Sequence, residues 1–365
     1  RAKIVVGTRS AVFAPVQNLG LIVMDEEQES TYKSESTPRY HARDIAKFRV
    51  NYNRAYCLLC SATPSVESYY MAQSGKYRYH ALHHRYGDAV VPTVQLVDMN
   101  NEDLYRGKPM ISMALARAVS ENIRAGRQSI LLLNRRGYHT YAVCKDCKTV
   151  AACPNCSISM TYHAANNRLM CHYCGHSEPA YVRGKACGGE LTLSGGGTQK
   201  AEEQLREAFP EARILRVDTD TTANKYALEK KLNAFANGEY DIMIGTQMVA
   251  KGLDFVNVTL VGVLSADQSL YSDDYRSNER TFDLLTQVVG RAGRGRYRGM
   301  ALIQTHVPEN PYLHLAAAQD YESFFEPEIR FRRAMLYPPF AELLQIGLVA
   351  EQEHTDRSAT EPLSR

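Results

Sequence analysis

Short apolar runs alternate with stretches of helical periodicity in the first quarter of the chain. The runs at 19–24 and 55–59 are rich in branched residues and end in polar or turn residues, as central strands of parallel sheets do. The stretch 39–49 places apolar residues at near-helical spacing, and residues 3–6 are expected to form a further strand. This strand–helix alternation predicts an α/β layer.

A second alternation begins after Pro92 and is interrupted by a cysteine-rich stretch. The expected strands are 93–97, 129–133, 213–217, 241–244, 259–264 and 300–304. The expected helices are 112–125, 199–209, 224–236 and 277–292. Because the alternation resumes past the three glycines at 195–197, we expect the cysteine-rich stretch to be an insertion in a second α/β lobe.

Seven of the nine cysteines follow the spacing C-x2-C-x5-C-x2-C-x14-C-x2-C-x12-C between Cys144 and Cys187. Each C-x2-C pair directs two thiolates at one ion, and two pairs complete a tetrahedral zinc site. Disulfide bonds are the alternative, but only Cys57 and Cys60 lie elsewhere and no secretory pattern is recognisable. The spacing therefore predicts a zinc module with reduced thiolates, in the cytoplasm.

Composition restricts the function only weakly. The 365 residues suggest two or three domains, and no apolar run approaches the roughly 18 residues that would span a membrane. The 43 basic and 40 acidic residues leave a net charge of +3, too balanced to indicate nucleic-acid binding by itself. The 23 tyrosines include several beside Arg or Lys, which can stack on bases but are also ordinary surface residues.

Polar side chains follow the two apolar runs of the first region. Asp25 and Glu26 end the first run, where open parallel sheets place their ligand sites. Such a pair suits a nucleotide hydrolase, in which one carboxylate holds Mg²⁺ and the next activates water. Ser61 and Thr63 follow the second run and reach the same sheet edge, although each could also simply cap a helix.

A basic motif ends the predicted helix 277–292. Helical spacing places Gln287, Arg291 and Arg294 on one face, where guanidinium groups could meet a developing phosphoryl charge. A helix C-terminus also favours cations through its dipole. That alternative does not explain the interleaved Gly290 and Gly293, which allow a partner backbone to approach.

In this order the three elements resemble the motor core of a superfamily 2 helicase. The sequence further resembles the family of primosomal replication-restart helicases from residue 3 to about 349, on the segments GTRSAVFAPVQNLGLIVMDEEQ, LCSATPSVES, LLLNRRGY, DIMIGTQMVAKGLDF and LLTQVVGRAGR. The resemblance implies two RecA-like parallel-sheet lobes with a zinc-binding module in the second. It implies an ATP-dependent 3′ to 5′ DNA helicase that restarts stalled replication forks and initiates primosome assembly.

The resemblance also implies cofactors, partners and residue roles. The cofactors are Zn²⁺ and Mg²⁺ with ATP, and the partners are single-stranded and forked DNA, other primosome proteins and single-strand binding protein, with no membrane.

Asp25 and Glu26 match the Mg²⁺ and water-activating carboxylates, and Ser61 and Thr63 match the coupling element. The arginine-finger motif is matched by Gln287, Arg291 and Arg294. The motif that touches nucleotide and DNA phosphate is matched by Gly245, Thr246, Gln247, Lys251, Gly252 and Asp254. Candidate DNA contacts are Arg9, Ser10, Tyr32, Tyr40 and His41.

The family arrangement divides the cysteines between two zinc sites. An inner site would use Cys153, Cys156, Cys171 and Cys174, and an outer site would use Cys144, Cys147 and Cys187. The outer site lacks one thiolate because Gly184 stands at the fourth position, so we expect weaker binding there. His176 or Glu190 could complete it.

The resemblance divides the chain into five segments. Residues 1–88 would be the carboxy-terminal part of the first lobe, 89–140 the start of the second lobe, 141–194 the zinc insertion, 195–340 the remainder of the second lobe, and 341–365 the start of a C-terminal domain or an irregular tail.

Two departures from the family affect the expected activity. No G-x4-G-K-[ST] loop occurs, so we expect this chain to be a fragment that does not turn over ATP as it stands. The acidic motif reads DEEQ where the family usually has DEEH, which replaces a titratable side chain by an amide. The alternative of a different class is a non-enzymatic, zinc-containing DNA-binding scaffold.

Overall fold

The computed structural model describes residues 3–34, 36–82, 92–133, 140–144, 146–147, 149–154, 160–163, 167–171, 176–180, 187–194, 198–217, 225–246, 255–270, 274–293 and 297–344. No helix in these ranges is both long enough and apolar enough to cross a membrane. Two parallel sheets and one antiparallel sheet organise them.

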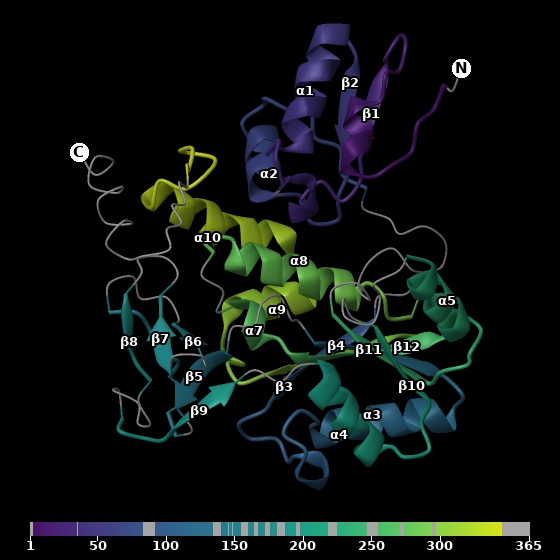
Figure 1. Cartoon of the computed structure of the whole chain (residues 1–365), viewed down its shortest axis with the longest axis vertical. Coiled ribbons are helices and arrows are strands. Elements are labelled where there is room, and N and C mark those ends of the chain that lie inside the picture. The colour runs from purple at the N-terminus through teal and green to yellow at the C-terminus, as the bar shows by residue number, and fades with distance from the viewer. Residues whose placement is uncertain are drawn as a thin grey trace.

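The first lobe is built on a two-stranded parallel sheet, at the top of Figure 1. Strand β1 (Leu21–Met24) pairs with β2 (Tyr56–Leu59), and α1 (Ala42–Asn53) packs on both. Helix α2 (Val66–Gln73) follows β2, and short 3-10 turns cover Arg9–Phe13 and Ser30–Tyr32. Ala42 and Ala46 of α1 face Met24 in a small core.

The helix expected at 39–49 begins and ends later than predicted. His41 caps it by accepting a hydrogen bond from the backbone N–H of Arg43, and the left-handed Arg54 terminates it. The expected strand at 3–6 is wrong. Residues 3–7 pair with no described strand, and Ile4 and Val6 are 82 % and 92 % exposed. A branched apolar run forms a strand only where a neighbouring strand satisfies its backbone hydrogen bonds.

The second lobe contains a six-stranded sheet in the order β10-β11-β4-β12-β13-β3, with every pair parallel. The strands are β3 (Thr93–Asp98), β4 (Gln128–Leu133), β10 (Ile214–Val217), β11 (Ile242–Gly245), β12 (Val258–Ser265) and β13 (Met300–Thr305). The central strands β4 and β11 are buried throughout, which explains why they are predominantly apolar.

Helices cover both faces of this sheet, and β4 shows how its side chains divide between them. Ile130 and Leu132 pack with α5 (Lys225–Ala236), α8 (Ser277–Val289), α9 (Pro311–Ala318) and α10 (Tyr321–Ala334). Leu131 and Leu133 pack on the opposite face with α3 (Met113–Arg124) and α4 (Thr198–Ala208). The predicted α/β fold with a parallel sheet is therefore confirmed.

The cysteine-rich region forms an antiparallel sheet between β4 and α4 in the chain. Its order is β8-β7-β6-β5-β9. The strands are β5 (Thr140–Cys144), β6 (Thr161–His163), β7 (Arg168–Met170), β8 (Ser177–Pro179) and β9 (Leu191–Ser194). Met160 and Leu169 are fully buried in a core of its own, beside Cys153 and Cys171.

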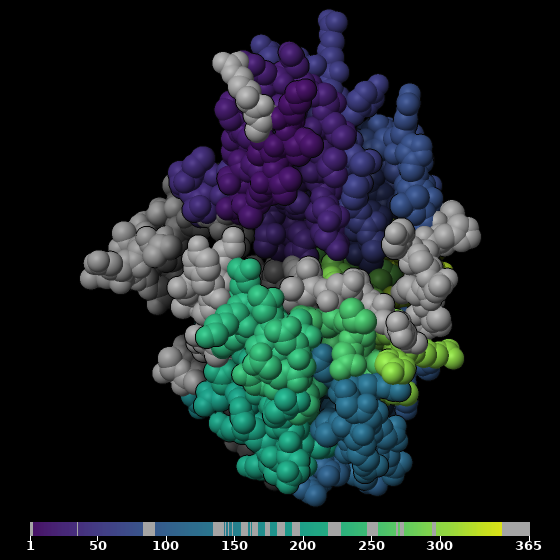
Figure 2. Space-filling view, turned by 90° about the vertical axis from the view of Figure 1, so that its right-hand side faces the viewer, coloured from purple at the N-terminus to yellow at the C-terminus, as the bar shows by residue number. Residues whose placement is uncertain are grey.

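The two lobes meet where α2 approaches α8 and α10 (Figures 1 and 2). Val66 and Tyr69, at the start of α2, are buried within the core of the second lobe. The Tyr69 ring packs edge-on against Phe325 and Tyr321, with centroids 4.7 and 5.1 Å away. The loop after β2 is thereby anchored to the second lobe by apolar contacts.

Candidate functional site

The carboxyl ends of β1 and β2 lie side by side, because the two strands pair in parallel register up to Met24 and Leu59. Asp25 and Glu26 follow β1 directly, and Ser61 and Thr63 follow β2. The structure thus brings together the two pairs that the sequence placed at one sheet edge. Glu26 has a left-handed backbone (φ 47°), a conformation that costs a non-glycine residue energy and is enriched at functional sites.

A chain of hydrogen bonds joins these two pairs. The Gln28 side-chain amide donates to Glu26 Oε2 (2.7 Å), and its carbonyl oxygen accepts from Ser61 Oγ (2.6 Å). Ser61 Oγ in turn accepts from the backbone N–H of Thr63 (2.9 Å). The Gln28 amide therefore connects Glu26 with the Ser61–Thr63 element in this structure.

The second lobe reaches the same carboxylate. Gln287, in the last turn of α8, donates its side-chain amide to Glu26 Oε2 across 3.5 Å. Arg291 follows the helix, while Arg294 lies outside the described residues. Helix α8 ends at Val289, earlier than predicted, and Gly293 then adopts φ 75° against Gly299, where an added Cβ would collide with the backbone.

Glu27 is an interaction centre that sequence reasoning missed. It is 2 % exposed and accepts hydrogen bonds from the Ser65 backbone N–H (2.7 Å), from Ser68 Oγ (3.0 Å) and from Arg43 (2.8 Å). In the run Asp25-Glu26-Glu27 the sequence alone does not show which carboxylate is buried. The signal that could have identified it is the pair Ser65 and Ser68 at the start of α2, which follows β2.

Three of the five candidate DNA-contacting residues line a cavity of about 440 Å³ beside Asp25. Its lining residues are Thr8, Arg9, Ser10, Asp25, Glu29, Thr31 and Tyr32. Arg9 donates to the backbone carbonyls of Thr31 and Lys33, and the Tyr32 hydroxyl donates to the carbonyl of Asp25 (2.7 Å). Arg9, Ser10 and Tyr32 therefore share one site with the predicted Mg²⁺ carboxylate.

Tyr40 and His41 lie outside that cavity lining. Tyr40 packs edge-on against Phe13, with ring centroids 4.9 Å apart, and the Arg9 guanidinium lies 5.7 Å from its ring centre. His41 is occupied by capping α1, and burial together with the nearby Arg43 lowers its pKa to about 4. The His41 ring is therefore neutral at pH 7.

The predicted nucleotide- and phosphate-contacting motif is only partly described. Gly245 ends β11 and is buried, and Thr246 follows it. Residues 247–254 lie outside the described residues, and with them Gln247, Lys251, Gly252 and Asp254.

Three cysteines of the insertion converge. The Sγ atom of Cys187 lies 3.3 Å from that of Cys144 and 3.2 Å from that of Cys147. Hydrogen bonding with Thr149 lowers the pKa of Cys147 to about 6, which favours the thiolate that binds metal. Glycine is required at 189, because a Cβ there would lie 2.7 Å from Cys144 Sγ and would collide with the Asp146 carboxylate. These features fit a zinc ion on the three thiolates.

The other predicted zinc ligands lie apart from this cluster or outside the described residues. Cys153 and Cys171 are both buried in the core of the insertion, while Cys156, Cys174 and Gly184 lie outside the described residues. Neither His176 nor Glu190 joins the cluster of three cysteines in the described part of the chain. His176 instead lies 3.9 Å from Glu178.

Comparisons with known proteins identify a cysteine-rich region and a helicase domain in this chain. Residues 153–179 match the model of the PriA DNA helicase Cys-rich region domain, and residues 193–296 match the helicase conserved C-terminal domain. The chain is 48 % identical to the replication restart protein PriA of Bacillus subtilis, over 96 % of this chain and 44 % of the relative. It is 44 % identical to that of Chlamydia trachomatis, over 94 % of this chain and 46 % of the relative.

These matches and the fold define a helicase-class α/β protein with a zinc-binding cysteine-rich region. The chain belongs to the PriA family of replication restart proteins. It spans about half the length of the curated relatives it matches. A solved structure of RecG bound to three-way DNA junction aligns with 95 % of this chain and 34 % of that chain, at 13 % identity and a TM-score of 0.45.

Proposed function

We propose that this chain supplies motor parts of an ATP-dependent 3′ to 5′ DNA helicase that restarts stalled replication forks in the cytoplasm. The hydrogen-bond chain from Gln287 through Glu26 and Gln28 to Ser61 is the observation that supports this most directly. It joins a helix of the second lobe to the carboxylate proposed to activate water, and that carboxylate to the proposed coupling element.

The proposed reaction is hydrolysis of the terminal phosphate of ATP. Asp25 would hold Mg²⁺, which neutralises phosphate charge, and Glu26 would accept a proton from water as its oxygen attacks the γ-phosphorus. The bond to the bridging oxygen breaks, giving ADP and phosphate, while Arg291 and Arg294 stabilise the developing charge. The motif that begins with Gly245 and Thr246 and includes Lys251, Gly252 and Asp254 would contact nucleotide and DNA phosphate.

The partners proposed from the family are single-stranded and forked DNA, other primosome proteins and single-strand binding protein. The test uses a protein that extends this chain to the length of its relatives, called the long form below. We expect single-stranded DNA to stimulate its ATP hydrolysis. We also expect the long form to unwind forked duplexes when ATP is present. DNA binding without any stimulated hydrolysis would instead support the zinc-containing scaffold.

Replacing Tyr32 by alanine should weaken single-stranded DNA binding and DNA stimulation of the long form. A base stacked on an aromatic ring is worth about 1–3 kcal/mol, so affinity should fall roughly 5- to 150-fold. Tyr52→Ala is the matched control, because Tyr52 is 82 % exposed on α1. Fluorescence anisotropy with labelled oligonucleotides measures the change, and equal losses in both variants would contradict a specific role for Tyr32.

The two proposed zinc sites should differ in affinity. The inner site, with Cys153, Cys156, Cys171 and Cys174, has four thiolates, whereas the outer site has three. We therefore expect a chelator to remove one zinc before the other, and Cys144→Ser to abolish the labile ion while Cys153→Ser abolishes the resistant one. Metal analysis during chelator titration measures this. Two equally resistant ions would show that the outer site is complete.

A further inference from the structure

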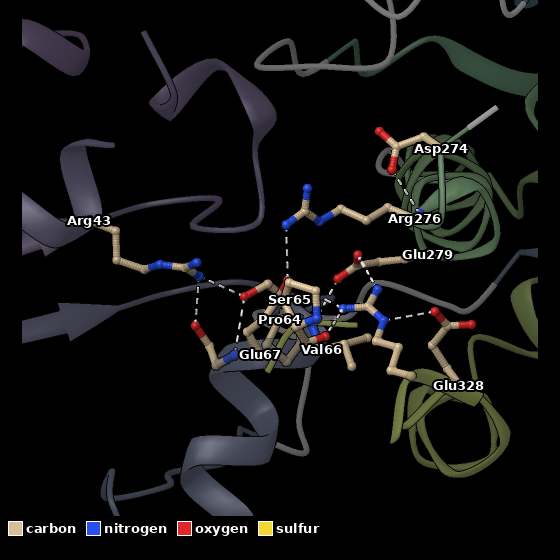
Figure 3. Close-up of polar contacts among 12 residues, drawn as sticks. Arg43, Pro64, Ser65, Val66, Glu67, Asp274, Arg276, Glu279 and Glu328 are labelled. Carbon is tan, nitrogen blue, oxygen red and sulfur yellow. Dashed lines mark hydrogen bonds and ion pairs between the residues drawn. The ribbon is translucent and has the colours of Figure 1, made fainter. Parts of the chain in front are cut away.

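Arg332 is the centre of a buried charge cluster between the lobes. Its side chain, on α10, is 0 % exposed and forms ion pairs with three carboxylates. The distances are 2.8 Å to Glu279 of α8, 2.9 Å to Glu328 of α10 and 3.3 Å to Glu67 of α2. Figure 3 shows Glu279 and Glu328 approaching from the second lobe and Glu67 from the first.

The second lobe holds residues 64–67 by further contacts. The Val66 backbone N–H donates to Glu279 (2.8 Å), Arg276 pairs with Glu67 (3.2 Å), and the Tyr321 hydroxyl donates to the carbonyl of Pro64 (2.5 Å). Although burial opposes it, the nearby Arg276 and Arg332 hold the pKa of Glu67 below its ordinary value, so this carboxylate is charged. These contacts fix the backbone at the start of α2 and the side chain of Glu67.

The same segment is held on its other side by the acidic motif. Glu27 binds the Ser65 backbone N–H and hydroxyl, and Arg43 donates to both Glu27 and Ser65. Figure 3 shows Arg43 reaching Ser65 from the first lobe. Residues 64–67 follow Ser61 and Thr63 immediately. The segment thus connects the acidic motif of the first lobe with α8, whose last turn carries Gln287.

Buried ion pairs specify geometry more reliably than they add stability, because desolvation offsets much of their attraction. A guanidinium that contacts carboxyl groups from three helices requires one relative placement of α2, α8 and α10. Helix α10 lies beyond residues 193–296, which the helicase family model matches.

We propose that Arg332 is a positioning residue that locks residues 64–67 to α8 and so couples the Ser61–Thr63 element to the arginine motif at the end of α8. This inference rests on the proposed function. The lock couples the two lobes without contacting nucleotide or DNA. Its loss should therefore reduce the stimulation of hydrolysis by DNA more than it changes KM for ATP.

The test is Arg332→Lys in the long form, because an ammonium cannot bind three carboxylates in the planar arrangement. We expect the DNA stimulation factor to fall about tenfold, within the roughly 5- to 150-fold range typical of coupling between sites. Arg330→Lys is the matched control, because Arg330 is exposed on the same helix and donates to the backbone carbonyl of Glu326. Equal stimulation in the two variants would overturn the proposal.

Glu67→Gln provides a second variant that keeps the side-chain shape and removes the charge shared by Arg276 and Arg332. It should reduce the stimulation factor in the same way, and combining it with Arg332→Lys should add little. The changes in thermal unfolding midpoint should also be less than additive in the double variant, and this measurement does not depend on ATP hydrolysis. If the unmodified long form hydrolysed no ATP but the midpoint changes were non-additive, the proposed function would fail while the lock persisted. Additive midpoint changes would show that no lock exists.

Discussion

Glu26→Gln is expected to lower DNA-stimulated ATP hydrolysis by the long form by roughly 10²- to 10⁴-fold, the contribution typical of a general base. Glu26 Oε2 accepts hydrogen bonds from Gln28 and Gln287. A glutamine carbonyl oxygen can accept the same two bonds, so the variant removes the proton acceptor while it preserves the connection between the lobes. The effect should therefore appear in kcat.

Single-stranded DNA affinity of the Glu26→Gln variant should stay within about twofold, because its effect is confined to the chemical step. Asp44→Asn is the matched control, since Asp44 is an exposed acid on α1. Steady-state turnover and anisotropy separate the two effects. If the variant retained normal turnover, Glu26 would not be the general base, and the acidic motif would serve DNA or structure instead.

The strands of the second lobe were predictable because parallel strands are buried on both faces. The runs at 129–133 and 241–244 fall within one residue of β4 and β11, since short, predominantly apolar runs are typical of parallel strands buried on both faces. Residues 3–6 have the same pattern and form no strand, because pairing depends on a neighbour that the local sequence does not reveal. The three-residue strands of the insertion are too short to show any periodicity.

The candidate site was predictable where sheet topology alone brings residues together. Asp25, Glu26, Ser61 and Thr63 follow adjacent parallel strands, so their proximity follows from the fold class. The contact between Gln287 and Glu26 joins residues 261 positions apart and was expected only from family resemblance.

No local pattern indicated the role of Arg332, and only the two serines at the start of α2 pointed to that of Glu27. The partners of Glu27 come from α1 and the start of α2, within the first lobe. The contact of Arg332 with Glu67 depends on the packing of α2 against the second lobe, and Arg332 looks in sequence like any basic residue in the last turn of a helix. Burial distinguishes it, because its side chain is 0 % exposed.

Arg294→Lys tests whether the two lobes form one motor, and it should produce the largest loss of activity. An arginine that stabilises the transferring phosphoryl group contributes about 10³- to 10⁵-fold to turnover, and an ammonium cannot reproduce its planar fork. The contact between Gln287 and Glu26 brings the end of α8 to the acidic motif, so the arginine motif begins beside the proposed site of hydrolysis.

We therefore expect Arg294→Lys to reduce kcat of the long form at least about 10³-fold, with a much smaller change in nucleotide affinity. Arg298→Lys is the matched control, because Arg298 is exposed four positions further along the chain. Stopped-flow binding of a fluorescent nucleotide and steady-state hydrolysis separate affinity from turnover. Near-normal turnover of Arg294→Lys would mean that Arg294 is not the arginine finger and serves only as a favourable cation beyond a helix C-terminus.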